Sequence, residues 1–432
     1  MLNPFLNLVA LEGREGPGPG ETLYRQHLRA IMRRYLVFVS FLIVLLSFNT
    51  STAQTALKVG TLVPFAGRSG DAGRECVRGM LDAARSLNQR GGVYGRKLEI
   101  LLVDDTFQPA EMLAAFRKLN EADNIPLLHV YSGATAQTLL PYIQFSRIPT
   151  VVGSLPSPLA NPSRNPYLFS IIPTPLDLAK IGITFISEKS GITSRKPKLA
   201  FIGSSDYLDQ HFLEEAKIYA KSMGLEVEPD LAFTDLSLLK EPDFSDRMLR
   251  QVSSLLTAIS KANPDFVYLS LNSREASTFV QEAKKMGLKT RWICNWNTFD
   301  EALTPYEGVL GVQPISYFGA DIPGMVDIKE AHQKWHAYDT HNVFYVEGWA
   351  TVLVMAEALG RSLPERQLSR EKVKTSLESF RNYVLGGLVP PLTITPEDHR
   401  PSVESRILVI RNGKISVQSS FISIPRERKP LR

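Results

Sequence analysis

Short apolar segments alternate with longer amphipathic segments along most of the chain. The first half has apolar runs at 57–63, 98–103, 126–131 and 149–152. Residues between these runs place apolar side chains at helical spacing, as at 74–89, 109–122 and 135–145. Strands that alternate with helices predict a parallel sheet covered by helices on both faces.

The pattern starts again after Pro173-Thr174-Pro175. Predicted strands follow at 198–202, 225–227, 265–270 and 291–294, with helices at 178–188, 208–223, 246–261 and 275–286. Two such runs separated by a proline-rich break predict an α/β protein of two doubly wound parallel-sheet lobes. Ligands of open parallel sheets bind beyond the carboxyl ends of the strands, so we expect the functional site at those ends.

The start of the chain is typical of a secretory signal peptide. Arg33-Arg34 precedes an apolar run at 35–48, and the small residues Ser51 and Ala53 follow it. The run is shorter than the roughly 20 apolar residues of a membrane span, which favours a cleaved signal over a retained anchor. We therefore interpret residues 1–53 as an N-terminal extension and signal peptide, with Met32 as an alternative start. Cleavage near Ala53 predicts a periplasmic or otherwise exported protein.

Composition and charge exclude several classes of protein. Hydrophobic residues make up 44% of the chain and charged residues 22%, which is typical of a globular protein. The net charge of +5 arises at the two ends, in residues 1–53 and in a basic tail at 426–432. The middle of the chain is balanced and shows no basic stripe, so we expect no nucleic-acid partner.

Motifs of enzymes are incomplete. The segment around Ser205 lacks the second glycine of a nucleophile elbow, because Tyr207 stands in its place. His332, His336 and His341 are close in sequence but belong to no H-E-x-x-H motif, so a solvated helix face is favoured over a metal site. We predict a protein that is not an enzyme and has no metal or cofactor.

One segment is more specific than the rest. A helix end at Asn88 leads through Gly91-Gly92 into the strand at 98–103 and the acidic pair Asp104-Asp105. This arrangement resembles the type I periplasmic solute-binding proteins, in the branch of the leucine/isoleucine/valine-binding protein. Further segments resemble the same family in the same order: 58–62, 131–135, 148–152, 206–207, 264–268, 283–289 and 348–359. The resemblance covers roughly 57 to 417.

The resemblance implies two lobes that are joined by three chain crossings and close around a small solute by hinge motion. The crossings would fall near 174–176, 312–316 and 386–388. Lobe one would comprise 57–173 plus 317–385, and lobe two 177–311 plus 389–425. The closed form would present its shape to a membrane partner.

In lobe one the resemblance implies a ligand contact after the third strand. Ser132 matches a serine that holds the ligand carboxylate, and Gly133 and Thr135 begin the next helix. Amides at a helix N-terminus favour an anionic group. After the fourth strand, Pro156 replaces a threonine of the family, so Ser154 or Ser157 would have to supply that hydroxyl.

In lobe two the resemblance is weaker. Tyr207 matches an aromatic residue that lines the cleft, and Asn272 or Ser273 replaces a tyrosine. Trp296 stands where the relatives have a glutamate for the ligand ammonium, and Trp349 is either a cleft-edge ring or core packing. These changes favour an anionic or amide-bearing ligand with an aromatic or apolar body over an aliphatic amino acid.

Three functions are compatible with these observations. The first, which we favour, is a monomeric exported carrier that delivers a small organic solute to an ABC permease. The second is a sensor that presents its closed form to a receptor or regulatory partner. The third is an exported enzyme, which is disfavoured because no catalytic set is visible.

Overall fold

The computed structural model describes most of the chain after residue 54. The described residues are 31–35, 55–66, 69–106, 108–204, 207–228, 231–234, 243–363 and 368–426. The chain divides into two compact units, Met1–Thr55 and Ala56–Arg432. In the first unit, residues 31–35 are helical and exposed. The apolar run at 36–48 and the cleavage region lie outside the described residues, so the signal peptide stays a prediction.

The second unit begins with a five-stranded parallel sheet. Its strand order is β2-β1-β3-β4-β5. The strands are β1 (Leu57–Val63), β2 (Leu98–Asp104), β3 (Leu128–Val130), β4 (Thr150–Val152) and β5 (Leu168–Phe169). The helices around it are α2 (Gly70–Gln89), α3 (Pro109–Arg117), α4 (Gly133–Ser146), α9 (Met325–Trp335), α10 (Val343–Ser362) and α11 (Arg370–Leu377), with a short π-helix at Lys118–Ala122.

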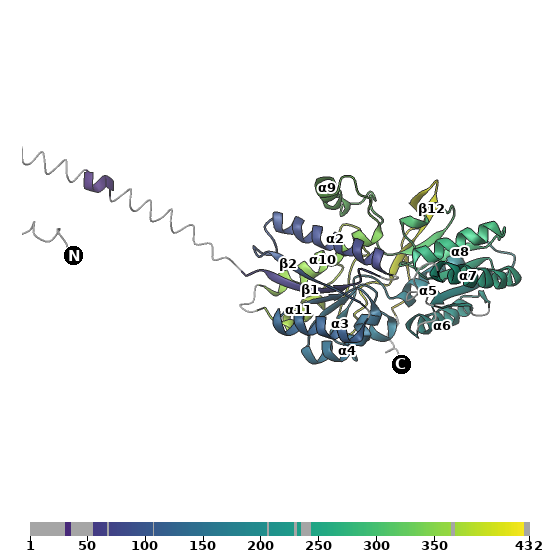
Figure 1. The fold of residues 1–432 in the computed structure, drawn as a ribbon, viewed down its shortest axis with the longest axis horizontal. Coiled ribbons are helices and arrows are strands. Elements are labelled where there is room, and N and C mark those ends of the chain that lie inside the picture. Colours follow the sequence, from purple (N-terminus) through teal and green to yellow (C-terminus); the bar gives the residue numbers. More distant parts are fainter. Residues whose placement is uncertain are drawn as a thin grey trace, which may run out of the picture. The chain divides into compact units, whose positions relative to one another are not determined.

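Alternation along β1 explains why this sheet is covered on both faces. Val59 and Val63 belong to the core cluster that contains α2 and α10. Leu62, which points to the opposite face, belongs to the cluster that contains α3 and α4. Figure 1 shows α2 and α4 on opposite sides of β1. α2 and α10 pack closely because Gly348 has no side chain. A Cβ atom at this position would collide with the Cys76 carbonyl.

The second sheet has nine strands in the order β13-β12-β11-β10-β9-β6-β7, with β14 paired to β12 and β8 to β6. The strands are β6 (Lys198–Ser204), β7 (Glu226–Val227), β8 (Leu231–Phe233), β9 (Phe266–Ser270), β10 (Arg291–Cys294), β11 (Leu310–Gln313), β12 (Glu404–Arg411), β13 (Lys414–Val417) and β14 (Ile422–Ser423). The strands β6 to β11 are parallel, and β12 to β14 are antiparallel additions.

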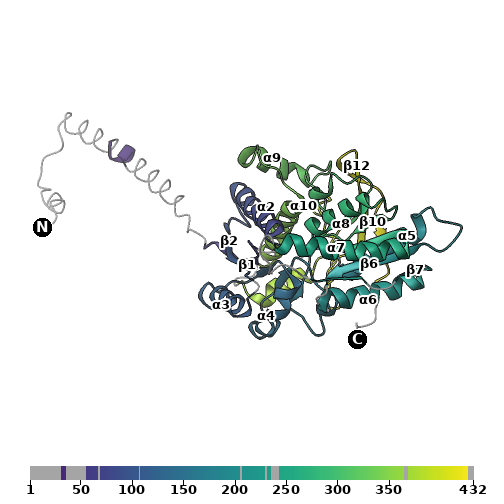
Figure 2. The same ribbon diagram turned by 45° about the vertical axis from the view of Figure 1, so that its right-hand side comes forward.

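Helices cover both faces of this sheet as well. They are α5 (Pro175–Lys189), α6 (Tyr207–Ser222), α7 (Asp243–Ala262) and α8 (Ser273–Lys285). Phe201 of β6 packs in the cluster that contains α5 and α6, whereas its neighbour Ile202 packs in the cluster of α7 and α8. Figure 2 shows α6 and α7 on opposite sides of β6. The predicted fold class, two doubly wound parallel sheets, is confirmed.

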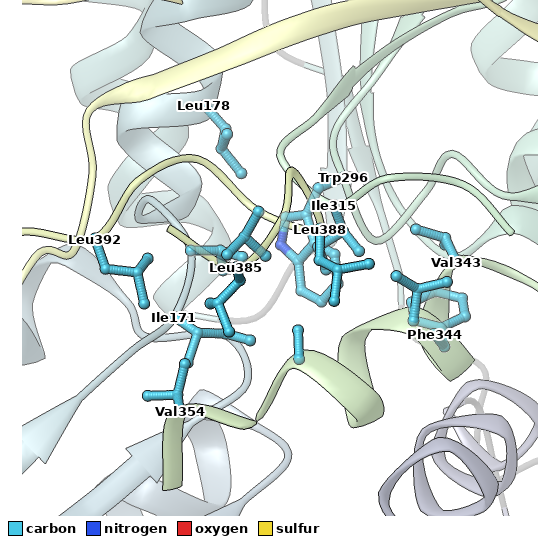
Figure 3. Close-up of a cluster of buried hydrophobic side chains, with 14 of the residues drawn as sticks. Ile171, Leu178, Trp296, Ile315, Val343, Phe344, Val354, Leu385, Leu388 and Leu392 are labelled. Atoms are coloured by element: carbon cyan, nitrogen blue, oxygen red, sulfur yellow. The ribbon is translucent and has the colours of Figure 1, made fainter. Parts of the chain in front are cut away.

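The segments that link the two sheets share one apolar core. Figure 3 shows buried side chains of this core from helices and from loops that follow the strands of both sheets, among them Ile171, Trp296 and Leu388. Backbone bonds hold two of the linking segments together, since the Ser316 amide donates to the Leu388 carbonyl at 2.9 Å. The Ser316 hydroxyl donates to the Gly387 carbonyl at 2.7 Å.

Helix α10 is also long and apolar enough to cross a membrane, the one such helix among the described residues. Its most apolar window is 89% buried inside the structure. Burial of this kind is typical of the central helix of a globular core.

The segment that carried the family resemblance has a clear structural role. Gly91 and Gly92 have φ values of 101° and 74°, which glycine adopts without strain. The Asn88 side chain then bridges the turn, because its amide bonds both the N–H and the C=O of Leu98 at 2.8 Å. The turn therefore fixes the end of α2 against the start of β2.

Candidate functional site

Three of the predicted ligand-binding residues meet at the N-terminus of α4, just beyond the end of β3. The Ser132 hydroxyl caps the helix by accepting from the Thr135 amide at 3.1 Å. The Thr135 hydroxyl donates to the carboxylate of Asp105, which follows β2 and is 1% exposed. The amides of Gly133 and Ala134 belong to the same turn and are not used by the cap. An internal carboxylate thus lies beside the helix end where we expected an anionic ligand.

The loop after β4 lies directly over this helix end. A Cβ atom on Gly133 would come within 2.5 Å of the Pro156 ring and 2.9 Å of the Ser154 carbonyl oxygen. Ser157 is buried, and its hydroxyl donates to the Thr174 hydroxyl at 3.1 Å, at the point where the chain leaves the first sheet. Ser154 is therefore near the α4 terminus, whereas the hydroxyl of Ser157 is already engaged.

Sequence reasoning missed a buried acid at the same strand ends. Glu347 lies on α10 and is 1% exposed, and neither of its carboxyl oxygens has a hydrogen-bond partner. Its Oε1 atom would be 3.2 Å from a Cβ on Gly153, the residue after β4. Burial raises the pKa of Glu347 to about 8. The signal in the sequence was a single acid inside an apolar run of helical length.

On the second sheet, Trp296 follows β10 and is 2% exposed. Its ring meets the Phe344 ring of α10 edge-on, with centroids 6.1 Å apart. Gln313 donates to the Trp296 carbonyl at 3.0 Å, which fixes the loop against β11. Trp296 therefore joins a loop of the second sheet to the first turn of α10. Trp349 of α10 is 1% exposed and packs in the main apolar core, which agrees with core packing, the second of its two predicted roles.

Asn272 follows β9 and forms a capping box at the start of α8. Its side-chain oxygen accepts from the Glu275 amide at 2.8 Å, and the Glu275 carboxylate accepts from the Asn272 amide at 3.0 Å. This local role accounts for part of its hydrogen-bonding capacity. Helix α6 starts at Tyr207, but the side chain of Tyr207 lies outside the described residues.

Acidic groups connect the second-sheet loops to helices of the first sheet. The Glu301 carboxylate accepts from the Val343 amide at the N-terminus of α10, at 3.0 Å. Burial raises the pKa of Glu301 to about 7. Burial also raises the pKa of Asp300, and the nearby charge of Asp71 on α2 adds to this effect.

The three histidines do not form the solvated helix face that we predicted. His341 is 6% exposed and lies 3.1 Å from a carboxylate oxygen of Glu75. His336 lies 2.8 Å from Asp82, and the His332 ring is 5.1 Å from that of His341. The prediction was wrong because α2 presents its acids to this side of α9. Among the described residues, no group of side chains has the arrangement of metal ligands.

Comparison with known proteins places the chain in a family. Residues 56–414 match the family model described as periplasmic binding protein. A curated relative, Leu/Ile/Val-binding protein homolog 7 of Brucella abortus (strain 2308), is 22% identical over 343 residues. That alignment covers 76% of this chain and 83% of the relative.

Solved structures agree in fold. A branched-chain amino acid ABC transporter protein from Thermus thermophilus, with bound valine, superposes with a TM-score of 0.76 at 20% identity. It is covered over 97% of its length, and 86% of this chain is covered. A fatty acid ABC transporter substrate-binding protein from Thermomonospora curvata gives a TM-score of 0.74 at 19% identity. The superposition covers 86% of this chain and 93% of that protein.

Proposed function

Because this chain belongs to the periplasmic binding protein family, in the branch of the Leu/Ile/Val-binding proteins, we propose that it is an exported carrier of a small organic solute. The solute would be an amino-acid-like compound, an amide or an aromatic or organic acid. The protein would hold it between two lobes, 57–173 plus 317–385 and 177–311 plus 389–425, and deliver it as a monomer to an ABC permease.

The observation that carries this proposal is the contact between Trp296 and Phe344. It joins a loop at the carboxyl end of the second sheet to the helix that borders the carboxyl ends of the first. Ligands of such sheets bind at these ends. Two aromatic rings at this junction supply an apolar surface for a solute, and opening the hinge would separate them.

The polar part of the proposed site comes from the first sheet. The amides at the start of α4 and the hydroxyls of Ser132 and Ser154 supply both donors and acceptors. Gly133 and Thr135 complete this turn. Ser157, Tyr207 and Asn272 stay predictions as further contacts from neighbouring loops.

The proposal is tested by ligand-induced stabilisation. The chain is expressed in full, recovered after export, then unfolded and refolded to remove any co-purified solute. Thermal melts follow with amino acids, amides, aromatic acids, fatty acids and dicarboxylates. A ligand at about 100 times its Kd adds roughly 2.7 kcal/mol, a shift of a few degrees.

Trp296→Ala should abolish the shift, because it removes the ring at the junction of the two sheets. Trp292→Ala is the matched control, since Trp292 lies on β10, the strand that Trp296 follows, but packs in the core of α7 and α8. Each variant is compared with its own ligand-free melt. If no solute shifts the wild-type melt, the carrier function is wrong and a sensor that binds a protein partner becomes the better hypothesis.

A further inference from the structure

Residues 392–401 lie against the edge of the first sheet, although the chain then continues into β12 of the second sheet. His399 is fully buried and stacks on the Phe169 ring of β5, with centroids 4.1 Å apart. Its Nδ1 atom lies 2.8 Å from the Leu168 carbonyl oxygen, and its Nε2 atom lies 3.2 Å from the Glu378 carboxylate. The segment is therefore fixed to β5 and to the end of α11.

Two arginines link the same segment to elements of the second sheet. Arg400 bonds both carboxylate oxygens of Asp398 at 3.0 Å, and it lies 3.4 Å from Asp177 in the first turn of α5. Arg426, three residues after β14, donates to the Asp398 carboxylate at 2.8 Å and to the Arg400 carbonyl at 3.0 Å. We call these four residues the clasp.

The clasp includes a buried charge next to the first predicted crossing. Asp177 is 3% exposed and forms the capping box of α5 with Thr174, where that crossing begins. Removing one partner of a buried ion pair is strongly unfavourable, because the remaining charge keeps its desolvation cost. Rotation of the second sheet away from the first would pull Asp177 and Arg426 from a segment that stays with the first sheet. The clasp therefore favours the arrangement of the two sheets that the structure shows.

The proposed site is assembled in this same arrangement. The Trp296 ring, from a loop of the second sheet, contacts Phe344 of α10, and Trp296 is 2% exposed. No residue of the clasp is among those that we propose to contact the solute. Arg426 also lies beyond residues 56–414, which match the family model. The clasp can therefore be altered without a change in the proposed site.

We propose that the clasp holds the ligand-free carrier in its closed arrangement, so that loss of Arg426 shifts the protein toward open forms. This inference rests on the carrier function proposed above and adds a device that controls closure. A guanidinium group suits this role, because its planar fork can bond a carboxylate and a carbonyl at once. The clasp would raise the affinity for solute by raising the population of the closed form, without touching the solute itself.

The test measures how well acrylamide quenches the fluorescence of Trp296. The full chain is recovered after export, then unfolded and refolded, and no solute is added. Opening would expose this ring. Arg426→Ala should shift the ratio of open to closed forms about tenfold, and the Stern–Volmer quenching constant should rise about 1.5-fold or more. The rise should vanish in a Trp296→Phe background, which keeps the other tryptophans of the chain.

Arg195→Ala is the matched control. Arg195 bonds both carboxylate oxygens of Asp265 at 2.6 and 2.7 Å, but both residues precede strands of the second sheet. This variant removes an ion pair of similar geometry that does not join the two sheets, so quenching should stay unchanged.

Asp398→Asn gives a second route to the same result. The variant is nearly isosteric and removes the charge that Arg400 and Arg426 both bind. It should raise the quenching of Trp296 as Arg426→Ala does, and it keeps the test available if Arg426→Ala does not fold.

The outcomes separate the clasp from the carrier function. Unchanged quenching in folded Arg426→Ala or Asp398→Asn protein would overturn the clasp. An equal rise in the Trp296→Phe background would also overturn it, because the whole fold would then have loosened. Both results leave the carrier function standing, since that function is tested by melts with solutes. If no solute shifts the melt while the Trp296 signal behaves as expected, the carrier function alone is wrong.

Discussion

The N-termini of α4 and α10 both lie at the carboxyl ends of parallel strands, but they are satisfied in different ways. At α4, Ser132 caps the helix from the residue directly before it. At α10, Asn342 caps from the same position, but Glu301 of the second sheet also accepts from the helix. The cap of the first terminus thus comes from the residue beside it, whereas the second terminus also uses a residue from a loop of the second sheet. In the two-lobe carrier proposed above, hinge opening would leave the Ser132 cap intact and would break the bond of Glu301.

Because the cap of α4 is local, we expect the N-terminus of α4 to be rigid. Its rigidity depends on the close packing of Gly133 against the loop of Pro156, since a Cβ atom added to this glycine would come within 2.5 Å of the proline ring. Gly133→Ala should destabilise the protein by about 2–3 kcal/mol, because neither ring nor backbone can move far in a packed core. Urea unfolding measures the loss. Pro156→Ala in the same chain should restore much of it, since the ring is then absent. Equal losses with and without the second substitution would contradict this account.

The α10 terminus predicts a pH dependence instead. Burial raises the pKa of Glu301 to about 7 in the folded protein, well above the value of an exposed glutamate. The folded state therefore holds this proton more tightly than the unfolded state does. Protonated Glu301 therefore contributes to the free energy of unfolding in full below about pH 4.5, and this contribution declines as the pH rises through about 7.

Glu301→Gln keeps an acceptor for the Val343 amide but cannot titrate. Between pH 5 and pH 7.5 the wild-type protein should lose on the order of 2 kcal/mol relative to this variant. Urea unfolding at the two pH values gives the difference. Parallel pH profiles for the two proteins would show that Glu301 does not titrate in this range.

Much of the fold was predictable because its signals are local. The run at 57–63 is largely apolar and is followed by Pro64, and β1 spans those residues. The strands β5, β8 and β11 were not predicted, because runs of two to four residues carry little periodicity, although β4 and β7 of similar length were predicted. The site was predictable only as a location. The capping box of Asn272 and Glu275 is visible in the sequence as an N-x-x-E pattern, whereas Glu347 is hidden in the apolar pattern of α10.

The smallest expected effect separates the two roles of Ser132. As a helix cap it should contribute about 1 kcal/mol, so Ser132→Ala should lower stability by that amount. Asn342→Ala removes the cap of α10, whose side chain accepts from the Phe344 amide at 3.0 Å, and should cost a similar amount. If Ser132 also contacts the solute, its variant should reduce the ligand-induced shift further than the Asn342 variant does. Melts of both variants, with and without ligand, give the comparison. Equal ligand-induced shifts would confine Ser132 to capping and would leave ligand contact at this helix end to the backbone amides.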